Sequence, residues 1–322
     1  MNIERLPTRA GVLEAARKIA AILPPTPLLP VTIGNVQCWV KAENLQPVGA
    51  FKIRGAWHRL TSLDEEQRAA GVVAVSSGNH AQGVAWAAKR LGIRATIVMP
   101  HDAPQVKLDA TRALGAEIVL YRRAAAEHGG EDRDAVAAEL LHERGGTLVH
   151  AFGDPWVIEG QGSAGIEISE QLGRVPSRIL ACCGGGGLTA GLWLACPEAE
   201  VHPVEPEGWD MVGQAMQTGE IVHAAPDAPK TICDALQPTA TKPVNLAVLM
   251  NHAAPGLTIT DEEVRAAQRF AFAQLRLVVE PGGAAALAAA LAGKVALDAH
   301  TVIMLTGGNT DPASFAATIA PP

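Results

Sequence analysis

The stretch GVVAVSSGNHAQGVAWAAKRLGIRATIVM, residues 71–99, decides the fold of this 322-residue chain. It places a short apolar run before a longer segment of helical periodicity, and a second apolar run follows. With the segments after it, it predicts a strand at 72–75, a helix at 79–91, a strand at 95–99, a helix near 103–114 and a strand at 117–120. Strands joined through helices pair in parallel, so an α/β unit is expected.

The same alternation returns in the second half of the chain. We expect a helix at 158–171, a strand at 179–182, a helix at 188–196, a strand at 200–204 and a strand at 302–305. A chain of 322 residues is also longer than one hydrophobic core usually holds. We therefore predict a discontinuous large domain, residues 1–65 and 150–322, with a small α/β domain of residues 66–149 inserted in it.

Composition excludes several classes of protein. Apolar residues make up 48% of the chain, and the net charge of −7 comes without a long basic cluster, so no nucleic-acid partner is expected. The N-terminus has no signal-peptide pattern, and the Ala/Leu-rich run 284–292 is about half a membrane span, so we expect a cytoplasmic protein without a membrane partner. Five cysteines without a CxxC pair argue against a disulfide framework or a zinc module.

Four consecutive glycines, Gly184, Gly185, Gly186 and Gly187, lie between the strand expected at 179–182 and the next helix. Backbone N–H groups at a helix N-terminus converge on anions, and ligands of open α/β sheets bind at the carboxyl ends of strands. The run is neither a Walker loop nor a dinucleotide fingerprint. It predicts a phosphate-binding turn, while a purely structural strand-to-helix turn stays open.

A second polar turn, Ser76-Ser77-Gly78-Asn79-His80, follows the strand expected at 72–75. Its hydroxyls, its amide and the free N–H groups of the helix that begins there suit a carboxylate. Capping of the helix by Ser77 or Asn79 is the competing interpretation.

A lone lysine, Lys52, follows the aromatic Phe51 in an apolar stretch. Partial desolvation there would lower the pKa of the amine and free it for Schiff-base formation. Arg54 is either a neighbouring charge or an ordinary residue at the start of a helix. Thr306 follows the strand expected at 302–305 and presents a neutral hydroxyl at a further strand end.

Together these stretches resemble, over nearly the whole chain, the pyridoxal-phosphate enzymes of fold type II, and specifically the serine/threonine dehydratase (ammonia-lyase) and serine racemase branch. The matching segments are ENLQP at 43–47, FKIRGA at 51–56, residues 76–83, VIEGQG at 157–162, the glycines at 184–187, EPEG at 205–208, VEPGGA at 279–284 and TGGN at 306–309. The resemblance implies two open, twisted, mostly parallel sheets flanked by helices, like those of the tryptophan synthase β subunit.

The resemblance also implies a role for each motif. Pyridoxal 5'-phosphate would be bound in the large domain, covalently attached to Lys52, with Phe51 packed on one face of its ring. Asn79 would hydrogen-bond the ring hydroxyl, and Thr306 would face the ring nitrogen. The four glycines would hold the phosphate. The substrate carboxylate would be bound by Ser76, Ser77, Asn79 and His80.

The reaction implied is the dehydration and deamination of a 3-hydroxy amino acid, such as L-threonine or L-serine, to a 2-oxo acid and ammonia. Lys52 would take the Cα proton, and the neutral Thr306 favours elimination over transamination because it makes the cofactor a weaker electron sink. Ser77 occupies the place from which racemases of this branch return the proton, so an amino-acid racemase stays an alternative. Dehydratases of bulkier substrates such as phenylserine, which the aromatic Phe152 would favour, or of 3-hydroxyaspartate stay open as well.

Three further expectations concern metals, partners and other classes of protein. Glu205 matches the family's divalent-cation carboxylate, but Met211 stands where a second carboxylate is expected, so a metal requirement is doubtful. The expected partner is a small amino-acid substrate, and the resemblance admits a homodimer. A non-enzymatic anion-binding α/β module would leave Lys52 unexplained, and a serine hydrolase using Ser163 lacks the glycine spacing of the nucleophile elbow.

Overall fold

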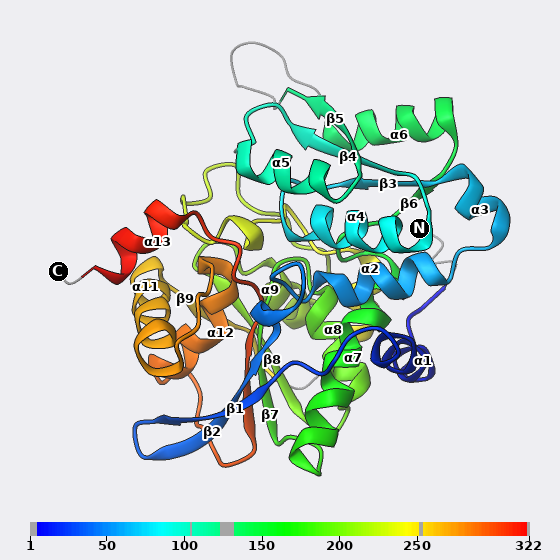
Figure 1. The fold of residues 1–322 in the computed structure, drawn as a ribbon. Helices are drawn as coiled ribbons and strands as arrows, with labels where there is room; N and C mark the ends of the chain where they lie inside the picture. Colours follow the sequence, from blue (N-terminus) through cyan, green and yellow to red (C-terminus); the bar gives the residue numbers. More distant parts are fainter. Residues whose placement is uncertain (1–4, 104, 123–131, 251–253, 321–322) are drawn as a thin grey trace.

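The computed structural model describes residues 5–103, 105–122, 132–250 and 254–320. These residues form two sheets flanked by helices, with strand orders β1-β2-β10-β7-β8-β9 and β5-β4-β3-β6. Figure 1 shows the smaller sheet at the top of the molecule and the larger sheet below it. The expected α/β class with two mostly parallel sheets is confirmed.

The four-stranded sheet is the unit expected from residues 71–120. Its strands all pair in parallel. They are β3 (Val72–Val75), β4 (Ala95–Pro100), β5 (Glu117–Tyr121) and β6 (Thr147–Leu148). The helices around them are α3 (Glu65–Ala70), α4 (Asn79–Leu91), α5 (Gln105–Ala113) and α6 (Arg133–Arg144). Every residue of β4 is buried, and all of them except Thr96 are apolar.

The six-stranded sheet contains the remaining described strands. They are β1 (Leu28–Ile33), β2 (Val36–Ala42), β7 (Arg178–Cys182), β8 (Glu200–Pro206), β9 (Leu257–Ile259) and β10 (Thr301–Leu305). The helices are α1 (Arg9–Ala20), α2 (Lys52–Thr61), α7 (Pro155–Leu172), α8 (Gly187–Ala195), α9 (Met211–Thr218), α10 (Pro243–Leu249), α11 (Asp261–Phe270), α12 (Pro281–Leu291) and α13 (Pro312–Ile319). Short helical segments lie at Glu43–Leu45 (η1), Asp234–Leu236 (η2) and Ala271–Leu275 (η3).

The two sheets divide the chain as the domain prediction divides it. All four strands of the smaller sheet lie within residues 66–149, and all six strands of the larger sheet lie outside that range. The domain boundaries themselves stay a prediction. No described helix is long and apolar enough to span a membrane, and the Ala-rich run at 284–292 falls almost entirely in the buried helix α12.

Glycines let the helix α7 approach its neighbours closely. A Cβ on Gly160 would lie 2.5 Å from Cα of Gly55 in α2, and a Cβ on Gly162 would lie 2.5 Å from the carbonyl oxygen of Gly191 in α8. Larger side chains at these positions would push the helices apart. The glycines of the GQGSAG segment are therefore explained by helix packing.

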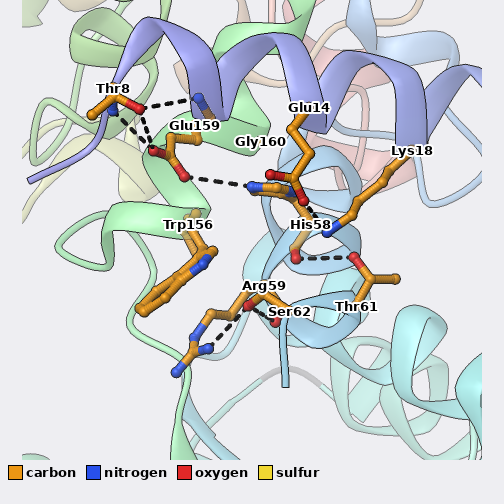
Figure 2. Close-up of polar contacts among 12 residues, drawn as sticks. Thr8, Glu14, Lys18, His58, Arg59, Thr61, Ser62, Trp156, Glu159 and Gly160 are labelled. Carbon is orange, nitrogen blue, oxygen red and sulfur yellow. Dashed lines mark hydrogen bonds and ion pairs between the residues drawn. The ribbon is translucent and has the colours of Figure 1, made fainter. Parts of the chain in front are cut away.

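A buried carboxylate, Glu159 of α7, ties the helix α1 to the body of the protein. It accepts hydrogen bonds from the backbone N–H of Thr8 at 2.9 Å and from Arg5 at 2.8 Å. Figure 2 shows Glu159 between Thr8 and His58 of α2, whose Nε2 lies 3.4 Å from the carboxylate. Three helices thus meet at this one side chain.

A second buried charge cluster settles the role of Arg54. Its guanidinium is fully buried and pairs with Glu43 at 2.7 Å and with Glu167 at 2.6 Å. Lys41 pairs with the same Glu167 at 2.8 Å. Arg54 is therefore a structural ion-pair residue in the first turn of α2, the turn that Lys52 begins.

Candidate active site

A cavity of about 1590 Å³ lies where loops following β3, β7 and β10 meet the start of α2. Among the described residues that line it are all the predicted cofactor and substrate residues: Phe51, Lys52, Ser76, Ser77, Asn79, His80, Gly184, Gly185, Gly186, Gly187 and Thr306. These residues come from distant parts of the chain, so the fold brings the predicted motifs into one place. Of the predicted site residues, Glu205 alone is absent from this lining.

Lys52 is the first residue of α2 and lines the cavity. Its Nζ donates a hydrogen bond to the carbonyl oxygen of Ala151 at 2.8 Å and lies 5.0 Å from the centre of the Phe51 ring. Burial lowers the pKa of the Lys52 amine to about 8. No described carboxylate forms an ion pair with it. A neutral, nucleophilic amine is therefore accessible near physiological pH.

The glycine turn, residues 184–187, runs from β7 into α8. Gly186 has φ +89°, a left-handed conformation that favours glycine, and it is the N-cap of α8. A Cβ on Gly185 would overlap the Phe152 ring, so that position also requires glycine. The first N–H groups of α8 have no acceptor within the helix and are free for an anion.

The serine-containing turn ends at the N-terminus of α4. The N-cap is Gly78, and no side chain caps the helix, so the competing interpretation that Ser77 or Asn79 is a cap was wrong. The Ser76 hydroxyl accepts a hydrogen bond from Gly78 N–H at 3.2 Å. His80 is buried, and its Nε2 lies 2.8 Å from the carbonyl oxygen of Val149.

The His80 ring is neutral and turned to the backbone. Burial lowers its pKa to about 3, with the nearby Lys52 charge adding to the effect. A neutral ring that donates from Nε2 to Val149 has no further N–H for a substrate carboxylate. The donors that remain at this turn are the free N–H groups at the start of α4 and the hydroxyls of Ser76 and Ser77.

Glu280 belongs to one of the segments that match the family, but no role in the site was predicted for it. The Asn79 amide donates to Glu280 Oε1 at 2.5 Å, and Asn309 donates to Asn79 Oδ1 at 2.8 Å. Burial raises the pKa of Glu280 to about 7. The signal was a single acid between Val279 and Pro281, directly before the apolar helix α12.

Thr306 directly follows β10. Its backbone accepts a hydrogen bond from Phe51 N–H at 3.1 Å and donates to the Gly283 carbonyl oxygen at 3.2 Å. The residue is buried, yet it contributes to the cavity lining. A neutral hydroxyl is therefore fixed beside the residue that precedes Lys52.

Glu205 has a different environment. Its carboxylate accepts hydrogen bonds from the N–H groups of Val212 at 2.9 Å and Gly213 at 2.8 Å, in the first turn of α9. Burial raises its pKa to about 8. The described part of the chain contains no group of three or more His, Cys, Asp or Glu arranged to hold a metal ion. These contacts give Glu205 a structural role at the start of α9.

Ser163 is poorly placed for a hydrolytic nucleophile. It is buried within α7, donates to the Gly160 carbonyl oxygen at 2.7 Å and accepts from Arg54 at 3.1 Å. It is not among the described residues that line the cavity. The serine hydrolase alternative therefore has no support in this geometry.

Comparison with known proteins identifies the family. The family model described as "Pyridoxal-phosphate dependent enzyme" matches residues 19–307. A serine racemase of Schizosaccharomyces pombe is 38% identical over 315 residues, which are 95% of each chain. An L-threo-3-hydroxyaspartate ammonia-lyase of Saccharomyces cerevisiae is 37% identical, over 98% of this chain and 97% of that one.

Solved structures agree with these relatives. The crystal structure of a threonine deaminase, from T.th., superposes with a TM-score of 0.85 at 38% identity, covering 95% of this chain and 99% of that one. Maize serine racemase gives a TM-score of 0.89 at 31% identity, covering 98% and 97%. The resemblance inferred from the motifs is confirmed. The chain therefore belongs to the family of pyridoxal-phosphate dependent enzymes.

Proposed function

We propose that this enzyme catalyses the dehydration and deamination of a 3-hydroxy amino acid to a 2-oxo acid and ammonia. The observation that carries the proposal is that one cavity is lined by Lys52, the glycine turn, the uncapped N-terminus of α4 and Thr306 with its neutral hydroxyl. The ammonia-lyase and threonine deaminase among its relatives support the same reaction.

The lining fits pyridoxal 5'-phosphate by its donor chemistry. Lys52 supplies an amine for the aldehyde, and the glycine turn at the start of α8 supplies N–H groups for the phosphate. Phe51 would pack on the cofactor ring, Asn79 would form a hydrogen bond with the ring hydroxyl, and Thr306 would face the ring nitrogen. When bound, the cofactor withdraws electrons from the substrate and acidifies its Cα hydrogen.

Lys52 then serves as the base. With a pKa of about 8, its free amine is partly neutral near neutral pH and accepts the Cα proton at Nζ. The hydrogen bond to Ala151 fixes where that atom lies. The proton held at Nζ is available to the departing hydroxyl, so water leaves, and later hydrolysis yields the 2-oxo acid and ammonia.

The substrate carboxylate would bind at the N-terminus of α4. Three kinds of group support this assignment: the unpaired N–H groups of the first turn, the Ser76 and Ser77 hydroxyls, and the positive end of the helix dipole. His80 would contribute its backbone N–H, since its neutral ring is bonded to Val149.

A substrate panel with a Lys52→Ala variant tests this function. The wild-type enzyme should release 2-oxo acid and ammonia from at least one of L-serine, L-threonine, phenylserine and 3-hydroxyaspartate. The variant should lose both turnover and the visible absorbance of lysine-bound cofactor. Retention of that absorbance together with turnover would refute the assignment of Lys52.

Racemisation is the second candidate, and the position of Ser77 favours it. Ser77 lines the cavity on the turn before α4, and its hydroxyl has no hydrogen-bond partner among the described residues. A serine racemase of 38% identity supports the same activity. If Ser77 delivers a proton to Cα, Ser77→Ala should lower inversion of serine, followed by chiral chromatography, about tenfold more than it lowers elimination.

A homodimer and a cytoplasmic location also stay proposals. Light scattering of the purified enzyme tests the first, and fractionation of cells that produce it tests the second.

A further inference from the structure

The cavity of this acidic protein contains a cation, Lys242, that the proposed cofactor and carboxylate sites do not use. The other cationic side chains of the described lining, apart from Lys52, each lie near a carboxylate: Lys107 near Asp234 at 3.0 Å, Arg265 near Glu262 at 3.6 Å and Arg133 near Asp134 at 3.8 Å. Lys242 is half-buried and pairs with no carboxylate in the part of the chain that the structure describes.

Hydrogen bonds fix the backbone that carries Lys242. The preceding Thr241 donates its hydroxyl to the Gly185 carbonyl oxygen at 2.9 Å, within the glycine turn. Asn245 donates to the Phe152 carbonyl oxygen at 2.9 Å. Both partners lie in the cavity wall, so Lys242 starts from a rigid segment between them.

The Lys242 stem and the His150 ring both lie over Gly153. A Cβ on Gly153 would lie 2.7 Å from Lys242 Cγ and 3.2 Å from His150 Nδ1, so glycine leaves room for both side chains. The pKa of His150 is lowered to about 4. Burial is the largest cause of this shift, and the positive charge of Lys242 is the second largest. His150 also lines the cavity.

The tautomer of His150 follows from its hydrogen bonds. Its Nδ1 accepts from the backbone N–H groups of Gly153 at 2.9 Å and Phe152 at 3.3 Å. A neutral ring whose Nδ1 is an acceptor carries its proton on Nε2. That N–H has no acceptor among the described residues, and the ring is held edge-to-face against Phe152, with centroids 4.6 Å apart. His150 is thus a fixed donor near a cation whose backbone is held in place.

We propose that Lys242 and His150 form a second anion subsite, which binds a carboxylate on the side chain of the substrate. The inference rests on the proposed function and deepens it: the preferred substrate class is a 3-hydroxy amino acid with two carboxylates, such as 3-hydroxyaspartate. One carboxylate is bound at the N-terminus of α4, and the other neutralises the unpaired cation. Serine and threonine offer no charge to this subsite.

The test compares kcat/KM for 3-hydroxyaspartate and L-serine in the holoenzyme. Hydrogen bonds to charged groups contribute enough that Lys242→Met should lower the ratio of the two values about 10- to 150-fold. His150→Phe, which removes a neutral donor, should lower it about 2- to 10-fold. Lys242→Arg should recover part of the ratio, which shows that charge rather than folding is responsible.

A matched control and a binding measurement complete the test. Arg265→Met removes another cation of the lining, one near Glu262, and should change the ratio less than about twofold. Calorimetry should show that the wild-type holoenzyme binds succinate more tightly than butyrate, and that Lys242→Met loses this difference.

The outcomes separate three errors. Release of no 2-oxo acid from any 3-hydroxy amino acid would refute the proposed function itself. Elimination with an unchanged ratio in Lys242→Met would refute only the subsite. An equal loss for both substrates, accompanied by weaker retention of cofactor, would assign Lys242 to the cofactor phosphate and overturn the inference.

Discussion

At the residue scale, the cavity holds two buried groups whose pKa values are displaced in opposite directions by the same cause. Burial lowers the pKa of Lys52 to about 8 and raises that of Glu280 to about 7. Both shifts favour the uncharged form, because a charge loses hydration when it is removed from water. Two groups that titrate near neutrality in one cavity are typical of an active site.

The Lys52 shift makes a prediction about cofactor uptake. An amine attacks an aldehyde only when it is deprotonated, and the deprotonated fraction of Lys52 rises as pH passes upward through its pKa. The rate at which cofactor-free protein recovers lysine-bound absorbance should therefore rise with pH, with a midpoint near 8 and not near the ordinary value of 10.5. Stopped-flow absorbance measures this rate. A midpoint above about pH 10 would contradict the shift.

At the element scale, regular alternation was readable from the sequence and irregular pairing was not. The predicted strand at 72–75 and helix at 79–91 match β3 and α4 at both ends. These boundaries were readable because the apolar run of the strand and the helical periodicity are separated by a short polar turn that contains Gly78. The antiparallel hairpin β1–β2 was missed, because no strand before residue 72 was predicted. Its signal was the two-residue turn Gly34-Asn35, where Gly34 has φ +60°.

Glu159 connects the helices α1, α2 and α7 (Figure 2), so a change at this residue should lower the stability of the fold. Glu159→Gln keeps an acceptor for Thr8 but removes the charge that Arg5 and His58 face. We expect the free energy of unfolding to fall by about 1–3 kcal/mol in urea titrations. The matched control is Glu14→Gln, which breaks the exposed pair with Lys18 at 2.7 Å and should cost less than about 0.5 kcal/mol. Equal effects of the two changes would rule out the linking role.

At the scale of the whole molecule, the sequence predicted which strand ends would carry the site but not which side chains would meet there. The motifs around Lys52, Asn79 and Thr306 were recognisable because each directly follows or precedes a regular element. The approach of Lys242 and His150 to the same glycine joins distant parts of the chain and depends on the space over Gly153. Such a contact arises from tertiary packing, and no local pattern reports it.

The arrangement of the cavity predicts how the cofactor stabilises the protein. The turn before α4 follows a strand of the smaller sheet, whereas the glycine turn and Thr306 follow strands of the larger one. A ligand that bonds to both groups links the two sheets, and its binding free energy adds to the stability of the folded state. Removing the cofactor should therefore loosen both sides of the cavity together.

Thermal unfolding and hydrogen exchange measure that loosening. Cofactor at about 100 times its Kd should raise Tm by about 4–8 °C over the cofactor-free protein. Lys52→Ala, which loses the covalent attachment, should show a smaller rise. Amide protection should increase at residues 76–83 and at 184–190 alike, because the ligand would contact helix N-termini on both sheets. Protection confined to 184–190 would mean that the cofactor binds the larger sheet alone, and the turn before α4 would then be left for the substrate.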